Sequence, residues 1–325
     1  MKPGTRATMA CEAAPPGRSA DSLRNLQQAF IEACTLDVTC FKPGNVSVES
    51  PGHGMQATDF IASAQAAAAP ICDPALGVGA RILGAVQATR LAVGCNTNLG
   101  IVLLAAPLLR AQQRRKVGQD LRAALADTLA RLGRDDALLA YRAIRLAAPA
   151  GLGRSARHDV NEEPAVTLLE AMLEGASRDS IARQYANDFA DVWSVGLPAL
   201  HRAHVRWKRE DAAVAAVYLG FLSACPDSHV LRKRGYALAE QVRREAAACQ
   251  AAVQTSSSWG EARLQLLGFD RRLKGRGINP GTSADLTVAV LLAERLGAAS
   301  CNEVQPRSAT AAGHEEVCGN DQSVG

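Results

Sequence analysis

The sequence predicts an all-α protein, a single bundle-like domain of many helices with functional loops between them. Composition is the first indication, because aromatic residues make up only 4% of the 325 residues while the helix-favouring Ala, Leu and Arg are abundant. Periodicity is the second, since apolar residues recur at intervals of three and four along most of the chain. The alternation typical of strands is limited to a short candidate at residues 45–49.

The helical segments follow in order from this periodicity. The first starts at Leu23 and cannot continue past Pro43. The second stops at Pro70. Beyond it, the predicted segments are 75–95, 101–111, 118–132, 135–147, 164–175, 179–207, 211–224, 232–253, 259–267 and 283–297.

Polar residues suited to cap helix N-termini stand before several of these segments. The segment 101–111 is apolar on all faces, so we expect it to be buried inside the bundle. The predicted N-caps are Asp21 or Ser22 for the first helix, Thr58 for the second, and Asp120 and Asp135 for the segments that begin near them.

The two ends of the chain differ in composition from its centre. Residues 1–20 are rich in Pro, Gly and Ala without periodicity, and residues 301–325 are rich in Gly, Ser, Asn and Glu. We therefore expect a disordered N-terminal arm, a helical catalytic domain at 21–300 and a disordered C-terminal tail.

Charge and cysteine content narrow the class of protein. A net charge of +4 is too small for a dedicated nucleic-acid-binding face. None of the nine cysteines forms a Cys-x-x-Cys pair, which disfavours a zinc ribbon and indicates reduced thiols. The sequence also lacks an apolar run of roughly 20 residues that could span a bilayer. We expect a cytoplasmic protein with small-molecule nucleotide substrates and neither nucleic acid nor membrane as partner; a homo-oligomer is compatible with the sequence.

Four polar loops between the helices carry the chemically informative residues. In the first, Pro43 and Gly44 shape a turn whose amides can point at an anion, and Lys42 adds positive charge. Most Lys-Pro-Gly sequences are plain surface turns, so this motif alone is weak. Asp59 follows at a helix start, where it can serve either the helix dipole or a site.

The second loop lies between two strongly apolar segments. Asn96, Thr97 and Asn98 are bracketed by glycines, the second of which is Gly100. A helix cap needs only one such residue, so the set indicates a cradle for phosphate or ribose.

The third loop offers acid–base groups followed by cations. Asp227, Ser228 and His229 place a carboxylate and an imidazole within reach of one site. Arg232 and Lys233 come one turn later and suit a polyphosphate. A plain helix cap with a solvated basic face is the alternative interpretation.

The fourth loop opens the last helix. Asn279 precedes a Pro-Gly turn, and Thr282 or Ser283 can cap the helix. Asp285 falls in the first turn, where it can match the dipole or hold Mg²⁺. The P-loop, Rossmann and nucleophile-elbow motifs do not occur in the sequence.

Taken in order, KPGNVS, GCNTNLG, PDSHVLRKRG and NPGTSADL resemble the triphosphoribosyl-dephospho-CoA synthase family. The resemblance runs from about Leu23 to Leu296 and implies an all-α enzyme that uses ATP and 3′-dephospho-CoA. In that reaction adenine is released and the triphosphoribosyl group forms an α-glycosidic bond to a ribose hydroxyl of the acceptor. The sequence departs from the family pattern at Asn98 and Leu99, where His and Lys are common, and therefore looks like a divergent branch.

The chemistry of such a transfer suggests roles for these residues. Cations must hold the triphosphate, carboxylates must steady an oxocarbenium-like centre or its Mg²⁺, and a base must accept the hydroxyl proton. The expected triphosphate ligands are Lys42, Arg232 and Lys233; the expected carboxylates and metal ligands are Asp59 and Asp285; the expected base is Asp227 with His229; further binding residues are Gly44, Asn96, Thr97, Asn98, Gly100, Ser228, Asn279 and Ser283.

Two other functions stay open at the level of sequence. One is a related α-ribosyl-phosphate transferase in the biosynthesis of a tetrahydromethanopterin-type cofactor, suggested by the lost His and Lys. The other is a helical protein that binds a nucleotide without catalysis. All three hypotheses require the loops around positions 42, 96, 227 and 285 to converge on one cleft.

Overall fold

The computed structural model describes residues 20–302 except 53 and 156, and this part of the chain is built of helices without strands. The predicted all-α fold is confirmed. The candidate strand at 45–49 is wrong, because only an isolated bridge between Gly52 and Met55 forms in this loop. The predicted arm and tail lie outside the described residues, apart from the helix ends at Ala20 and Asn302.

The first helix begins at Ala20, so its predicted N-caps Asp21 and Ser22 lie inside it. Residues 228–234 form a separate short helix, divided at Gly235 from the helix predicted at 232–253. The helices otherwise follow the predicted order. They are α1 Ala20–Thr39, α2 Ala57–Cys72, α3 Val78–Val93, α4 Leu99–Arg114, α5 Leu121–Leu129, α6 Arg134–Ala147, α7 Leu168–Gly175, α8 Ser180–Ala186, a π-helical turn Val192–Gly196, α9 Leu197–Trp207, α10 Glu210–Ala224, α11 Ser228–Arg234, α12 Tyr236–Thr255, α13 Trp259–Gly275 and α14 Gly281–Asn302.

Two helix ends differ from the prediction for local reasons. Gln56, not Thr58, is the N-cap of α2, and its backbone N–H donates to the Asp59 carboxylate at 2.9 Å. Pro70 lies inside α2 and does not stop it, since a proline in the last turn removes only one backbone hydrogen bond. Asp120 caps α5 as predicted, by accepting from the Ala123 amide at 2.7 Å.

The start of α6 also differs from the prediction. Its N-cap is Gly133, not Asp135. The carboxylate of Asp136 accepts from the Gly133 amide at 3.0 Å and from the Gly79 amide at 2.8 Å. Asp136 thus satisfies the open end of α6 and ties it to the start of α3, a contact between distant segments that helix periodicity does not reveal.

The segment predicted as one helix over 179–207 is broken into α8, the π-helical turn and α9. Asp188 and Phe189 adopt left-handed backbone conformations, with φ of 53° and 57°. Such conformations are unfavourable for these residues. Complete burial of the Phe189 ring beside Tyr185, with centroids 5.8 Å apart, offsets the cost.

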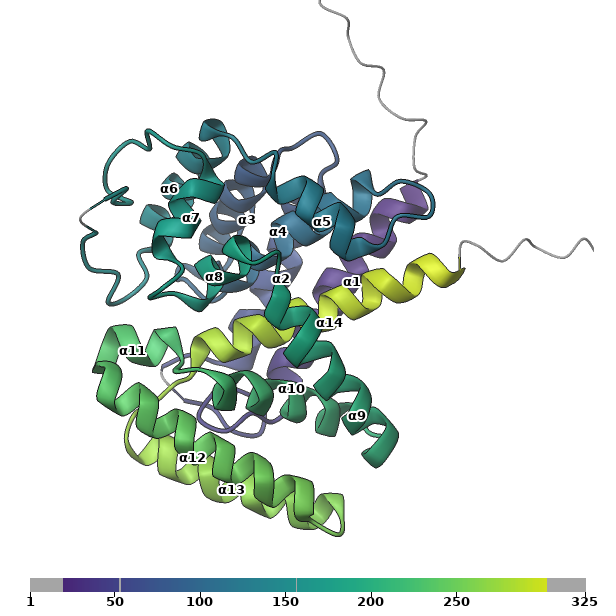
Figure 1. The fold of residues 1–325 in the computed structure, drawn as a ribbon, viewed down its shortest axis with the longest axis vertical. Helices are drawn as coiled ribbons and strands as arrows, with labels where there is room; N and C mark the ends of the chain where they lie inside the picture. The colour runs from purple at the N-terminus through teal and green to yellow at the C-terminus, as the bar shows by residue number, and fades with distance from the viewer. Residues whose placement is uncertain (1–19, 53, 156, 303–325) are drawn as a thin grey trace, which may run out of the picture.

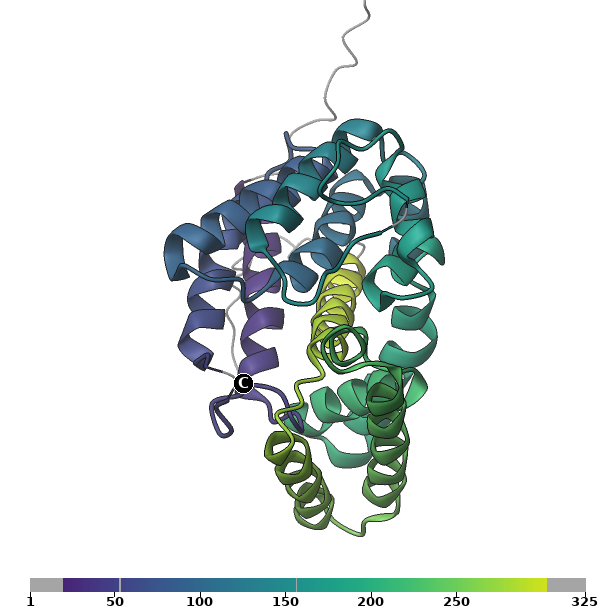
Figure 2. The same ribbon diagram turned by 90° about the vertical axis from the view of Figure 1, so that its left-hand side faces the viewer.

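The helices form two groups with α14 between them (Figure 1). Helices α1–α8 make up one group and α9–α13 the other, and α14 packs against α1, α4 and α10. Turned by 90°, α14 again lies between the N-terminal helices and the pair α12 and α13 (Figure 2). As predicted, α4 is buried on nearly all faces. Because α14 and α10 supply side chains to both hydrophobic clusters, they hold the two groups together.

Among the described helices, none combines the length and apolar composition that a membrane span requires. Helices α10 and α11, which are bent by 53° relative to each other, are together long and apolar enough for a broken membrane span, by length and composition alone.

Candidate functional site

A cavity of about 840 Å³ opens where the N-termini of α4 and α14 meet α11 and the loop after α6. Leu99 and Gly100 begin α4, Gly281 begins α14, and all three line the cavity. The amides at a helix N-terminus carry partial positive charge and lack partners within the helix, so they favour an anion. Two such ends facing one cavity make it suited to a phosphate-bearing ligand.

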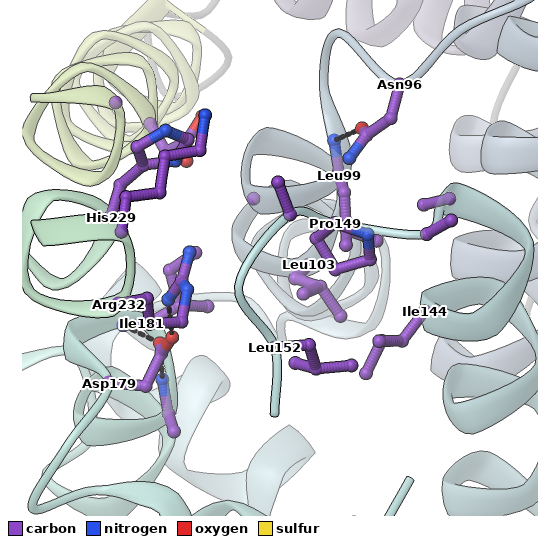
Figure 3. Close-up of a pocket in the computed structure, with 18 of the residues that line it drawn as sticks. Asn96, Leu99, Leu103, Ile144, Pro149, Leu152, Asp179, Ile181, His229 and Arg232 are labelled. Atoms are coloured by element: carbon purple, nitrogen blue, oxygen red, sulfur yellow. Dashed lines mark hydrogen bonds and ion pairs between the residues drawn. The ribbon is translucent and has the colours of Figure 1, made fainter. Parts of the chain in front are cut away.

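The cationic side of the cavity is formed by α11. His229, Arg232 and Lys233 all line it, followed by Arg234. The Arg232 guanidinium donates to the carboxylate of Asp179, which also caps α8 (Figure 3). Held in this way, Arg232 presents a fixed positive charge to the cavity.

Asp285 supplies a carboxylate to the cavity lining. A Cβ added at Gly100 would overlap the Asp285 carboxylate, so only glycine lets the two helix starts approach this closely. Burial raises the pKa of Asp285 well above its usual range, and the nearby Asp37 and Asp227 carboxylates raise it further while Arg232 lowers it. Asp37 also lines the cavity. The site therefore favours either a proton or a cation on this carboxylate.

Asp227 does not line the cavity but joins two helices. Its side chain is buried, and one oxygen accepts from the amides of His229 and Val230 at 2.9 and 3.1 Å. The other accepts from the amide and hydroxyl of Ser283, both at 2.8 Å. With both oxygens engaged, Asp227 caps α11 and is bonded to the start of α14, so it is poorly placed to accept a substrate proton.

A second polar link joins the same two helix starts. The Ser228 hydroxyl donates to that of Thr282 at 3.0 Å and accepts from the Ser180 amide at 3.3 Å. Ser228 and Ser283, both predicted to bind the nucleotide, are thus buried in the helix junction and do not line the cavity.

The Lys-Pro-Gly loop is fixed from within the protein. Lys42 is fully buried, forms an ion pair with Asp37 at 3.2 Å and donates to the Asp37 carbonyl. Gly44 has a φ of 79°, its amide donates to Asp270 at 2.7 Å, and an added Cβ would lie 2.7 Å from Leu273. Neither Lys42 nor Gly44 lines the cavity. Asn45, which we did not predict, does line it.

Fixing the loop in this way also orders two amides at the cavity. The Asn45 side chain donates to the Asn279 side chain at 2.8 Å, and both residues line the cavity. The fourth motif therefore reaches the site through Asn279 and Asp285, and the first motif reaches it through Asn45.

Some residues of the second loop line the cavity, and others point into the protein core. Asn96, Thr97 and Gly100 line the cavity, and the Asn96 carbonyl oxygen accepts from the Leu99 amide at 3.1 Å. Asn98 points into the interior, where it donates to the Thr89 hydroxyl at 2.9 Å.

Asp59 also lies away from the cavity. Its carboxylate accepts the Gln56 amide at the start of α2, and it is not among the lining residues. The predicted metal pair of Asp59 and Asp285 is therefore not brought together at this site. In the part of the chain that the structure describes, no group of three or more His, Cys, Asp and Glu side chains is arranged to hold a metal.

The long loop between α6 and α7 contributes residues outside the four motifs. Ala148, Leu152 and His158 line the cavity, and Ala148 and His158 have φ values of 47° and 52°. Asp159 shapes the loop by accepting from the Ser155 and Asn161 amides at 2.7 and 2.8 Å, and these bonds lower the pKa of Asp159. The length and Gly and Pro content of this loop were the available signal for its role.

Comparison with known proteins identifies the family. Residues 23–304 match the family model CitG, ATP:dephospho-CoA triphosphoribosyl transferase. The chain belongs to this family. Its members are transferases that use ATP, and the reaction of this chain is transfer of the triphosphoribosyl group to dephospho-CoA.

The solved structures give a consistent fold. A crystal structure from Archaeoglobus fulgidus, which carries the proposed name triphosphoribosyl-dephospho-CoA synthase, is 24% identical in sequence with a TM-score of 0.56. The match covers 73% of this chain and 99% of that one, and at this identity it shows a shared fold. None of the curated protein sequences matches the chain.

Proposed function

We propose that the cavity between α4, α11 and α14 is where the triphosphoribosyl group passes from ATP to dephospho-CoA. The observation that carries this proposal is that two helix N-termini, the cations of α11 and the Asp285 carboxylate all face one cavity. In the reaction, the bond between adenine and C1′ of ribose breaks. A bond forms from C1′ to a ribose hydroxyl oxygen of dephospho-CoA, and the hydroxyl proton leaves, balanced by the proton that adenine gains.

The triphosphate is assigned to the cationic side. Arg232 and Lys233 provide charge there, and the N-termini of α4 and α14 provide partial positive charge. Lys42, which the sequence suggested for this role, is left out of the proposal because its side chain is fully buried and does not line the cavity.

Asp285 is assigned to the ribose. Positive charge develops at C1′ as adenine leaves, and a carboxylate in a partly enclosed site stabilises such a centre more strongly than in water. Burial raises the pKa of Asp285, and positive charge developing nearby at C1′ would favour its ionised form.

Magnesium fits the donor groups at this position. Asp285 and Asp37 both line the cavity, and Mg²⁺ in nucleotide sites commonly uses one or two carboxylates together with phosphate oxygens. We propose Asp37 in place of Asp59 as the second carboxylate. When bound, the ion would neutralise phosphate charge and help to orient the triphosphate.

His229 is assigned to the acceptor's hydroxyl proton. Its Nδ1 lies 3.3 Å from the position a Cβ on Gly281 would take, so the ring is held beside the start of α14. Imidazole is suited to accept a proton near neutral pH. Asp227 becomes a positioning residue, because it fixes the helix that bears His229 against the helix that bears Asp285.

The phosphate assignment can be tested with matched arginine variants. Arg232→Gln should lower kcat/KM for ATP about tenfold to a hundredfold, as expected for a lost charge-assisted hydrogen bond. Arg142→Gln makes the same change at an exposed arginine outside the cavity and should leave the rate unchanged. Adenine release with dephospho-CoA as acceptor is the readout. Equal kcat/KM values for the two variants would remove Arg232 from the triphosphate site.

Because Arg232 also contacts Asp179, a second variant separates folding from binding. Lys233 is exposed and forms no ion pair with any described residue. Lys233→Gln should therefore preserve the melting temperature. An increase in KM for ATP of several-fold is expected. No change in KM for either cationic variant would contradict the assignment of α11 to the phosphates.

A further inference from the structure

The side of the cavity opposite the cations is apolar. Leu99 and Leu103 from α4, Ile144 from α6, and Pro149 and Leu152 from the following loop form this surface, here called the apolar wall. Figure 3 shows Leu103, Ile144 and Leu152 on one side of the open space, with His229, Arg232 and Asp179 on the other. The cavity therefore presents the cations of α11 to one end of a ligand and these apolar side chains to the other, with Arg90 beside the apolar wall through its bond to the Leu146 carbonyl.

Leu152 is the most exposed member of the apolar wall. It is 42% exposed, although leucine side chains gain stability from burial. Its loop is held in place, because Gly151 has a φ of 76° and a Cβ there would lie 3.1 Å from the Arg232 carbonyl oxygen. The contact between the loop and α11 thus fixes the position of Leu152, whose side chain lies apart from those of Arg232 and His229 in Figure 3.

The shape of a nucleotide matches this division. Its base and its 5′-phosphates are attached at opposite ends of the ribose, so a site that holds phosphates on one side places the base on the facing side. We propose that the apolar wall is the subsite for the adenine base of the ATP donor. The inference rests on the proposed function, since it takes the cations of α11 as the phosphate site.

The properties of the apolar wall favour a purine over the flexible arm of dephospho-CoA. A flat heteroaromatic ring gains from apolar side chains across its faces and needs polar groups only at its edge. The arm contains two amides that would each require a partner. Asn96 also lines the cavity, and since its carbonyl oxygen accepts from Leu99, its amide nitrogen is the group able to donate to a ring nitrogen.

Binding of adenine alone tests the subsite independently of turnover. Titration calorimetry with adenine and with inorganic triphosphate would be carried out on the full chain and on Leu152→Ser. Adenine should bind about fivefold more weakly to the variant, as expected when a partly exposed leucine loses much of its apolar contact. Triphosphate affinity should not change. Leu152→Met keeps the apolar surface and should bind adenine like the wild type.

Leu264→Ser is the matched control. Leu264 is 66% exposed on α13 and lies outside the cavity, so its replacement should leave both affinities unchanged. Equal adenine affinity in Leu152→Ser and the wild type would overturn the subsite, as would undetectable binding of adenine to the wild type. Melting temperatures of both serine variants show that the fold is kept.

Inhibition by adenine identifies which substrate's base occupies the subsite, because dephospho-CoA also contains adenine. Competition against ATP supports the proposal. Competition against dephospho-CoA alone would overturn it. If no transfer to dephospho-CoA occurs, the proposed function fails, while the calorimetric dependence on Leu152 still reports on the subsite itself.

Discussion

Replacing Asp227 by alanine should weaken the junction between α11 and α14. Its carboxylate accepts four hydrogen bonds, two at the start of each helix. Loss of the α11 cap costs roughly 1 kcal/mol. The buried amide and hydroxyl of Ser283 lose their acceptor, at roughly 1 kcal/mol each. The free energy of unfolding should therefore fall by about 3 kcal/mol, and for a chain of this size the melting temperature should fall by about 4 °C.

The control for this prediction is Asp120→Ala. Asp120 is exposed and caps only α5, through one hydrogen bond, so its replacement should cost roughly 1 kcal/mol. Thermal and urea unfolding of the two variants gives the comparison directly. An Asp227→Ala variant no less stable than Asp120→Ala would contradict the prediction, because the double cap would then contribute nothing beyond a single one.

Three further predictions concern the cavity. Gly100→Ala should destabilise the protein and lower activity at least tenfold, because its Cβ would overlap Asp285 and lie 2.8 Å from Ile181. The control Gly268→Ala on α13 should stabilise the protein by up to about 1 kcal/mol. An equal effect of the two substitutions would contradict the close contact at Gly100. Asp285→Asn should melt at a higher temperature than the wild type at pH 8. Because the pKa of Asp285 is raised in the folded protein, folding favours its protonated form, and the wild type loses stability as the pH rises. The difference in melting temperature between Asp285→Asn and the wild type should therefore vanish near pH 4. An Asp285→Asn variant less stable than the wild type at pH 8 would contradict this. Cys95 is exposed at the cavity, so alkylation mapped to Cys95 by mass spectrometry should slow in the presence of ATP, and unchanged alkylation would argue against ATP binding here.

The fold could be predicted because its signals are local. Helix-forming composition and apolar spacing recur within each segment. The burial of α4 could be predicted because the segment 101–111 lacks a polar face. The break after α8 could not be predicted in the same way. Phe189 occupies a left-handed conformation only because its ring is buried, and burial depends on the packing of distant helices.

The site could be predicted in part for the same reason. The polar loops before α4, α11 and α14 marked residues that line the cavity: Asn96, Thr97, Gly100, His229, Arg232, Lys233, Asn279 and Asp285.

The roles of individual loop residues depend on packing that the sequence does not display. Asp227 and Asn98 are sited in the expected loops, but each bonds to an interior partner. Lys42 is paired with Asp37 from the preceding helix. Leu103 has the sequence signature of a core residue, so the apolar wall becomes visible only when the loop after α6 is placed beside α4.

We have proposed that the triphosphoribosyl group of ATP passes to dephospho-CoA in this cavity. Mass spectrometry of the acceptor, after incubation of the purified protein with ATP, dephospho-CoA and Mg²⁺, tests it most directly. We expect dephospho-CoA that has gained one triphosphoribosyl group, formed in equal amount to free adenine. Unchanged dephospho-CoA, with Mg²⁺ or Mn²⁺ present and no adenine released, would contradict it.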